Sequence, residues 1–262
     1  MATEVAIVGT SRARRVGFYT AVVLALALVV FGLGELLYLG IVGWLGESAL
    51  EAATEPGAGP HLFHIHAHAL FAWLLLITLA AQLRHPEQRV AAAVFGLAAM
   101  ITYSLGTLVS GNFDPLEAVA ILLLLAVFWL NPGREAATAA PFHKRALLAS
   151  IPILAGGLVV AVVEVRRQVS GLTTDQHVEF GHHALVATLA VIVALAAVFG
   201  SSSLTGRRLV AGLAVGGLLY IGVASVLFPD HVSSFAVLGG VATIAAAVIY
   251  GWGAITRYST TT

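Results

Sequence analysis

The sequence predicts an all-α integral membrane protein, and three observations support this fold class. Of its 262 residues, 59% are hydrophobic and only 10% are charged, and the mean hydropathy is +0.96, which lies outside the range of soluble domains. The hydrophobic residues fall into about eight apolar segments, most of them close to the roughly 20 residues that a membrane-spanning helix needs. Short polar connections separate the segments, so no separate soluble domain is expected.

Short stretches of turn-forming residues separate the apolar segments. Proline, glycine, asparagine, aspartate and serine mark the breaks between them, as turn residues do. The first segment follows three arginines, as in a signal peptide, but its apolar run is longer than a signal peptide's, so we expect a retained helix. The predicted helices cover residues 16–40, 64–83, 90–109, 116–130, 146–165, 182–200, 209–228 and 232–255.

The positive charges predict the orientation. With the N-terminus in the cytoplasm, most of the 13 Lys and Arg residues fall on the inner side, as the positive-inside rule requires. Both termini are then cytoplasmic. The inner residues are Arg12, Arg14, Arg15, Arg84, Arg89, Arg134, Lys144, Arg145, Arg207, Arg208 and Arg257, which leaves Arg166 and Arg167 outside.

An internal duplication is predicted from matching features in the two halves. His68-Ala69-Leu70 recurs as His183-Ala184-Leu185, each time at the start of an apolar helix that ends near a basic turn. The neighbouring features also match in order, including one acid in each first helix. We therefore predict two parallel four-helix repeats, residues 1–135 and 136–262, related by a pseudo-twofold axis along the membrane normal.

Histidines gather on the predicted outer side. His61, His64 and His68 share one stripe of the second helix, while His66 points away from it. In the sixth helix, Glu179 and His183 are one turn apart, with His182 beside them and His177 on the far side. The parallel repeats would bring the two faces together. Eight of the ten histidines lie on this side: His61, His64, His66, His68, His177, His182, His183 and His231.

This pattern predicts a transition-metal site. The chain has no cysteine, so thiolate ligands are excluded, whereas neutral imidazole suits Zn, Cu and Fe. The candidate ligands are His61, His64, His68, Glu179, His182 and His183. Glu35 and Glu164 reach the same depth beyond their basic helix starts, and acids at that depth normally face the bundle interior. We expect both carboxylates to hydrogen-bond to the metal-binding histidines and so fix their orientation, without binding the metal themselves.

The stretch from His64 to Trp73 resembles the His-led helices that hold haem b in the heme-copper oxidase and nitric oxide reductase group. This resemblance implies a haem b with His68 as one axial ligand and His183 as its partner, and with the propionates near Arg166 and Arg167. The deeper histidines of a heme-copper centre are absent, so the resemblance implies haem binding without that catalytic centre.

Two main functions and one further function remain open from the sequence. The first is a multi-pass protein of the cell membrane that binds haem b or a Cu, Fe or Zn ion and exchanges electrons with a periplasmic or extracellular partner. The second is a transporter of a metal ion or small solute that uses the outer histidines and acids as its entry site. A zinc- or iron-dependent membrane hydrolase or hydroxylase is a third reading, so enzymatic activity is left undecided. A net charge of zero gives no general attraction to nucleic acid.

Overall fold

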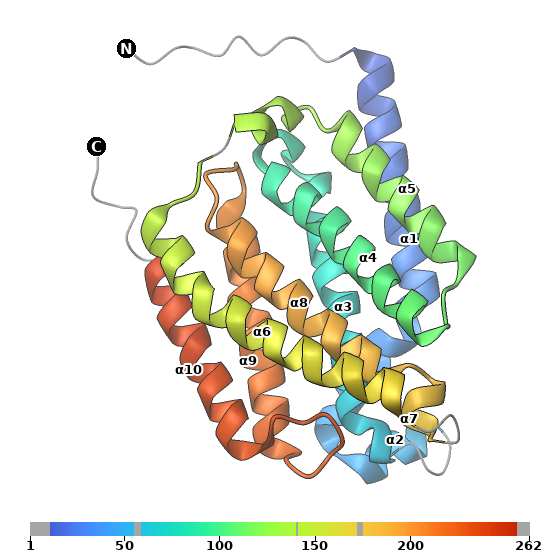
Figure 1. Cartoon of the computed structure of the whole chain (residues 1–262). Helices are drawn as coiled ribbons and strands as arrows, with labels where there is room; N and C mark the ends of the chain where they lie inside the picture. Colours follow the sequence, from blue (N-terminus) through green and yellow to red (C-terminus); the bar gives the residue numbers. More distant parts are fainter. Residues whose placement is uncertain (1–10, 55–58, 140, 172–174, 256–262) are drawn as a thin grey trace.

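The computed structural model describes residues 11–54, 59–139, 141–171 and 175–255, and these residues form helices and no β-strand. Each predicted apolar segment coincides with a long helix (Figure 1). The long helices are α1 (Arg12–Val42), α3 (Leu62–Ala80), α4 (Val90–Ser110), α5 (Pro115–Leu130), α6 (Lys144–Ser170), α8 (His182–Gly200), α9 (Arg207–Leu227) and α10 (Ala236–Ile255). Two short helices are α2 (Glu47–Ala53) and α7 (Gln176–Glu179), and short 3₁₀ turns include Gly59–His61.

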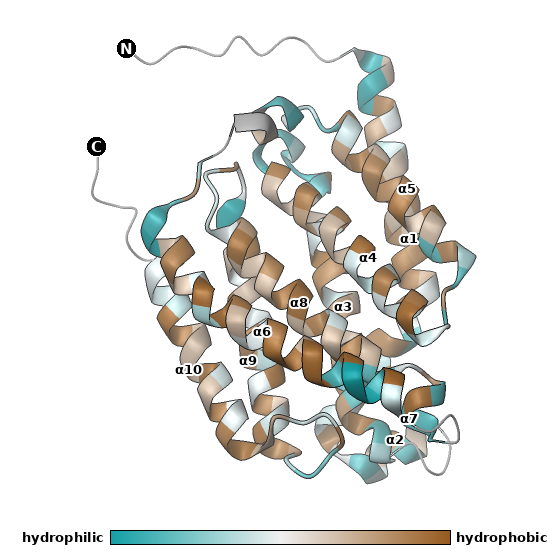
Figure 2. Ribbon diagram, viewed as in Figure 1, coloured by the Kyte–Doolittle hydropathy of each residue, from teal (hydrophilic) through white to brown (hydrophobic). Residues whose placement is uncertain are grey.

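The long helices have the composition of membrane spans. Seven of them are long and apolar enough to cross a membrane, whereas α5, with 16 residues, is shorter. At 1.5 Å per residue α5 covers roughly 24 Å of a hydrocarbon core about 30 Å thick. Hydrophobic residues cover the middle of the bundle, and hydrophilic ones gather towards its two ends (Figure 2). The structure thus supports a membrane protein, while eight spans remain a prediction.

The location of the termini also remains a prediction. Helix α1 begins, and α10 ends, at the end of the bundle opposite α2 and α7 (Figure 1). Residues 1–10 and 256–262, including Arg257, lie outside the described residues.

Helices α3 and α8 form the centre of the bundle. In each, 72% of the most apolar stretch is buried, compared with 28% for α1, 22% for α6 and 17% for α10. The outer helices expose large apolar side chains such as Phe31 and Leu238, which are 88% and 83% exposed. Apolar surfaces of this extent suit a lipid environment. The central helices are those that begin with the clustered histidines.

The two halves make matching helix contacts. In the first half α3 packs on α1, α1 on α5, and α5 on α4; in the second, α8 packs on α6, α6 on α10, and α10 on α9. Between the halves α4 packs on α8, and α9 on α3. A duplication would produce this pairing. The superposition of residues 1–135 on 136–262 stays a prediction.

Close packing of α1 on α3 depends on Gly40. A Cβ atom at Gly40 would overlap the Cβ of Ala69, which has no side-chain freedom to move away. We expect Gly40→Ala to lower the free energy of unfolding by about 1 to 3 kcal/mol, measured by thermal unfolding in detergent. A Cβ atom at Gly34 of the same helix meets nothing within 4 Å, so Gly34→Ala is the matched control. Equal unfolding temperatures for the two variants would contradict this packing.

Candidate metal centre

Four histidines converge where α2, α7 and the first residues of α3 and α8 meet, here called the histidine end (Figure 1). They come from different elements: His61 ends the 3₁₀ turn before α3, His64 lies in α3, His177 in α7, and His182 begins α8. Each offers a ligand atom, and all four atoms lie within 4.8 Å of one another. We call these residues the four-histidine group.

The rings of the four-histidine group pack directly on one another. His64 and His182 are stacked, with centroids 4.6 Å apart, and the ring of His61 lies 4.8 Å from those of both His177 and His182. Within the described part of the chain, one ring nitrogen of each residue is buried without a hydrogen-bond partner: Nδ1 of His61, His64 and His182, and Nε2 of His177. Buried polar atoms are normally paired. Four unpaired imidazole nitrogens in one place therefore form a donor set suited to a metal ion.

Asp175 orients His177. Its Oδ1 accepts hydrogen bonds from the backbone N–H of His177 at 2.9 Å and from the ring Nδ1 at 3.0 Å. Both hydrogen bonds lower the pKa of the Asp175 carboxyl, and the bond from the backbone N–H has the larger effect. With the proton held on Nδ1 by an ionised carboxylate, Nε2 keeps a lone pair for a metal, as in carboxylate–histidine–metal arrangements.

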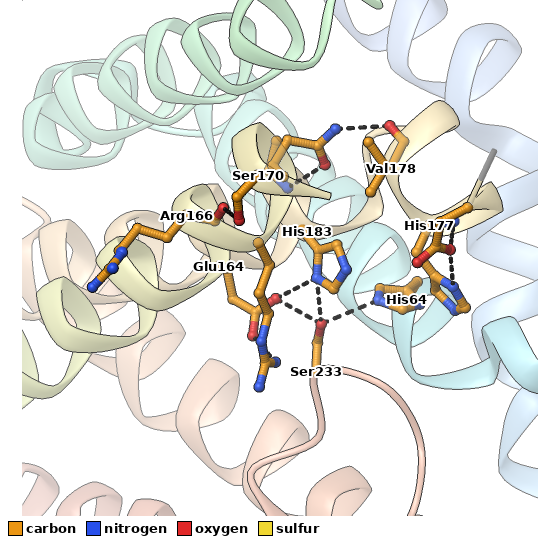
Figure 3. A network of polar contacts seen from close by, with 12 residues as sticks. His64, Glu164, Arg166, Ser170, His177, Val178, His183 and Ser233 are labelled. Atoms are coloured by element: carbon orange, nitrogen blue, oxygen red, sulfur yellow. Dashed lines mark hydrogen bonds and ion pairs between the residues drawn. The ribbon is translucent and has the colours of Figure 1, made fainter. Parts of the chain in front are cut away.

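A second polar network supports His64. Ser233 Oγ donates to Glu164 Oε2 at 2.7 Å, and the Nδ1 of His183 contacts the same oxygen at 2.6 Å (Figure 3). His64 Nε2 lies 3.4 Å from Ser233 Oγ. Because the serine proton is used by the carboxylate, His64 must donate from Nε2, which leaves its Nδ1 as a lone pair facing the four-histidine group.

Gln168 holds α7 and α8 against α6. Its Nε2 donates to the backbone oxygen of Val178 at 2.7 Å, and its Oε1 accepts from the backbone N–H of Ala184 at 3.3 Å. One buried side chain thus fixes the backbone on both sides of the turn between His177 and His182.

This turn explains why the prediction for His177 is wrong. A continuous helix would put His177 on the far side from His183, but α7 ends at Glu179 and α8 begins at His182. Between them Gly181 has φ 71°, in the left-handed region that favours glycine. The change of direction turns His177 into the group. It leaves Glu179 exposed and outside the four-histidine group, contrary to its expected alignment with His183.

The remaining predicted ligands take other positions. His68 lies outside the four-histidine group, with its ring 6.4 Å from that of His182. His183 is buried, and its Nδ1 faces Glu164. Arg167 is paired with Glu164 at 2.7 Å, while the side chain of Arg166 is exposed. Arg167 therefore lies beside the Glu164 network, whereas the side chain of Arg166 extends away from it (Figure 3).

The two acids predicted to orient the histidines differ. Glu164 is buried and contacts His183, Ser233 and Arg167, as expected of a carboxylate that faces the interior. Glu35 is exposed, so the prediction that both acids point into the bundle is wrong for Glu35. Depth along a helix follows from counting residues, but the direction of a side chain around the helix does not.

His66 points away from the group, as its place on the helix predicts. It is buried against Trp44 and Phe228, and its Nδ1 lies 2.9 Å from the hydroxyl of Tyr220. The supporting residues Asp175, Gln168 and Ser233 were missed from the sequence. The spacing of Asp175 and His177 is a usable signal for the first, but nothing local marks Gln168 or Ser233.

Comparison with known proteins found no matching family model, no similar curated protein and no similar solved structure.

Proposed function

We propose that this protein holds one transition-metal ion through His61, His64, His177 and His182 and uses it for electron transfer at the histidine end. The observation that carries the proposal is that each of the four histidines offers a ligand atom within 4.8 Å of the others, and that each has a buried ring nitrogen with no hydrogen-bond partner among the described residues. Asp175 bonds His177 directly and adds a negative charge near the group, which offsets part of the charge that four neutral imidazoles leave on the ion.

A single ion fits this group better than haem. A porphyrin occupies four positions around its iron and leaves two for protein ligands, whereas four imidazoles converge here. Haem b between His68 and His183 remains a prediction from the resemblance, and an absorption spectrum distinguishes the two.

The number of ligands favours electron transfer over hydrolysis. A hydrolytic metal site keeps a coordination position open for water, and four protein ligands would close a tetrahedral site. Copper and iron both bind imidazole and change oxidation state. A transporter would instead need polar groups that continue across the membrane, whereas Thr78 and Thr188 are the only buried polar residues of α3 and α8 besides histidines, among the residues that the structure describes.

Metal analysis of the full chain tests the proposal. Protein purified in detergent and loaded in turn with Cu, Fe or Zn should retain about one ion per chain. The copper or iron form should change its absorption spectrum on reduction, without the Soret band of a haem. A Soret band at one haem per chain would replace the ion with haem b, and failure to retain any of these metals would overturn the site.

A further inference from the structure

A polar cavity lies beside the four-histidine group. It has a volume of about 190 Å³ and is bounded by residues of α3, α4, α5 and α8. His68 lines it, and the ring of His68 is 6.4 Å from that of His182. Its other polar lining residues include Tyr103, Thr107, Asn112 and Glu117. The predicted ligand that lies outside the four-histidine group thus faces a space that a small polar group could enter.

An apolar cavity of about 170 Å³ lies between α1, α3, α4 and α5. Leu28, Val29, Leu75 and Leu124 are among its lining residues. Gly32 and Leu116, which also line it, are exposed on the outside of the bundle. That outer surface carries the exposed apolar residues of α1 and α5, so the cavity opens towards the lipid side.

Tyr103, Asp114 and Glu117 line both cavities. Glu117 is buried, and its Oε2 accepts a hydrogen bond from Thr107 Oγ1 at 2.7 Å. The ring of Tyr103 is stacked on Phe71 with centroids 4.1 Å apart. Because these three residues line both cavities, the two cavities adjoin at this point, with His68 lining the polar cavity and Leu28, Leu75 and Leu124 lining the apolar one.

The lining restricts what can bind. No Lys or Arg is among the residues described as lining either cavity, and two acids lie at their boundary, so a carboxylate or phosphate head would meet repulsion without a cation. A neutral head with hydroxyl or carbonyl groups would instead find hydrogen-bond partners. The small volumes suit one ring and one chain rather than a two-chain phospholipid.

We propose that these cavities bind a lipid-soluble molecule with a single apolar tail and a neutral hydroxyl- or carbonyl-bearing head. The head lies beside His68 and the tail lies between α1 and α5. The binding site is inferred from the cavities alone. Only the role of the bound molecule as an electron partner of the metal ion rests on the proposed function. Quinols and long-chain alcohols share this chemistry.

Photo-crosslinking of the full chain in detergent tests the proposal. The probe is a decyl-tailed benzoquinone with a diazirine in its tail, and we expect crosslinks to peptides of α1 and α5. Unlabelled decyl benzoquinol should compete, and dodecanoate should not. Competition by dodecanol to the same degree would identify a general alcohol site, whereas competition by the quinol alone would identify a quinol site. Equal competition by dodecanoate would overturn the neutral head.

Gly32 and Gly34 offer a matched pair of variants. A Cβ atom at either meets nothing within 4 Å, but only Gly32 is described as lining the apolar cavity. Gly32→Phe should lower probe affinity at least about tenfold by filling the cavity, while Gly34→Phe should leave it unchanged. Equal affinities, or crosslinks only outside α1 and α5, would overturn the proposal. Metal content measured on the same samples is independent, so failure of the metal site and failure of the lipid-soluble ligand are separately visible.

Discussion

Replacing His177 with alanine should lower metal affinity at least about 100-fold, because it removes a nitrogen that binds the metal directly. Replacing a residue that only hydrogen-bonds to a ligand already costs about 10- to 100-fold. The remaining three imidazoles would bind with water in the fourth position. Competition titration of the purified protein with a chromophoric chelator measures the change. Asp175→Asn, which keeps the shape but weakens the acceptor at His177 Nδ1, should give a smaller loss of about tenfold.

Glu179→Ala is the matched control for His177→Ala. Both residues lie in α7, two positions apart, but Glu179 is exposed and outside the four-histidine group. Its replacement should leave metal affinity unchanged. If Glu179→Ala weakens binding as much as His177→Ala, the ligand set is the one expected from a continuous helix, and the turn at Gly181 does not form the site.

Replacing Glu164 with alanine should lower the free energy of unfolding by about 3 kcal/mol, because a buried acceptor is removed from charged and polar partners. Glu164 joins His183 of α8, Ser233 of the turn before α10, and Arg167 of its own helix. Without it, the buried groups of His183 and Ser233 lose their shared acceptor. Chemical or thermal unfolding in detergent measures this loss of stability. Because Ser233 also contacts His64, the loss of Glu164 should affect metal affinity as well.

Glu35→Ala is the control for Glu164→Ala. The two acids occupy matching depths in the predicted repeats, yet Glu35 is exposed. We expect its replacement to change the unfolding temperature and metal affinity little, since surface substitutions are usually within 0.5 kcal/mol. Comparable destabilisation by the two variants would contradict this difference, because it would mean that Glu35 faces the interior as Glu164 does.

The helices themselves could be read from the sequence. A stretch such as residues 182–200 is apolar along its whole length, and a membrane requires its backbone to satisfy its own hydrogen bonds, so helix formation is a local property. The convergence of His61, His64 and His182 near one end was also readable, because residue counts fix depth along a helix. These local rules account for much of the candidate site.

The direction of each side chain around its helix was decided only by the tertiary structure. Lipid and protein interior are both apolar, so the hydrophobic pattern of α1 did not reveal that Glu35 faces outward. Likewise, the left-handed Gly181 redirects His177. Ser233 reaches Glu164 across 69 positions of the chain. Sequence periodicity describes one continuous helix at a time, whereas the four-histidine group depends on a turn and on contacts between helices, which only the folded bundle fixes.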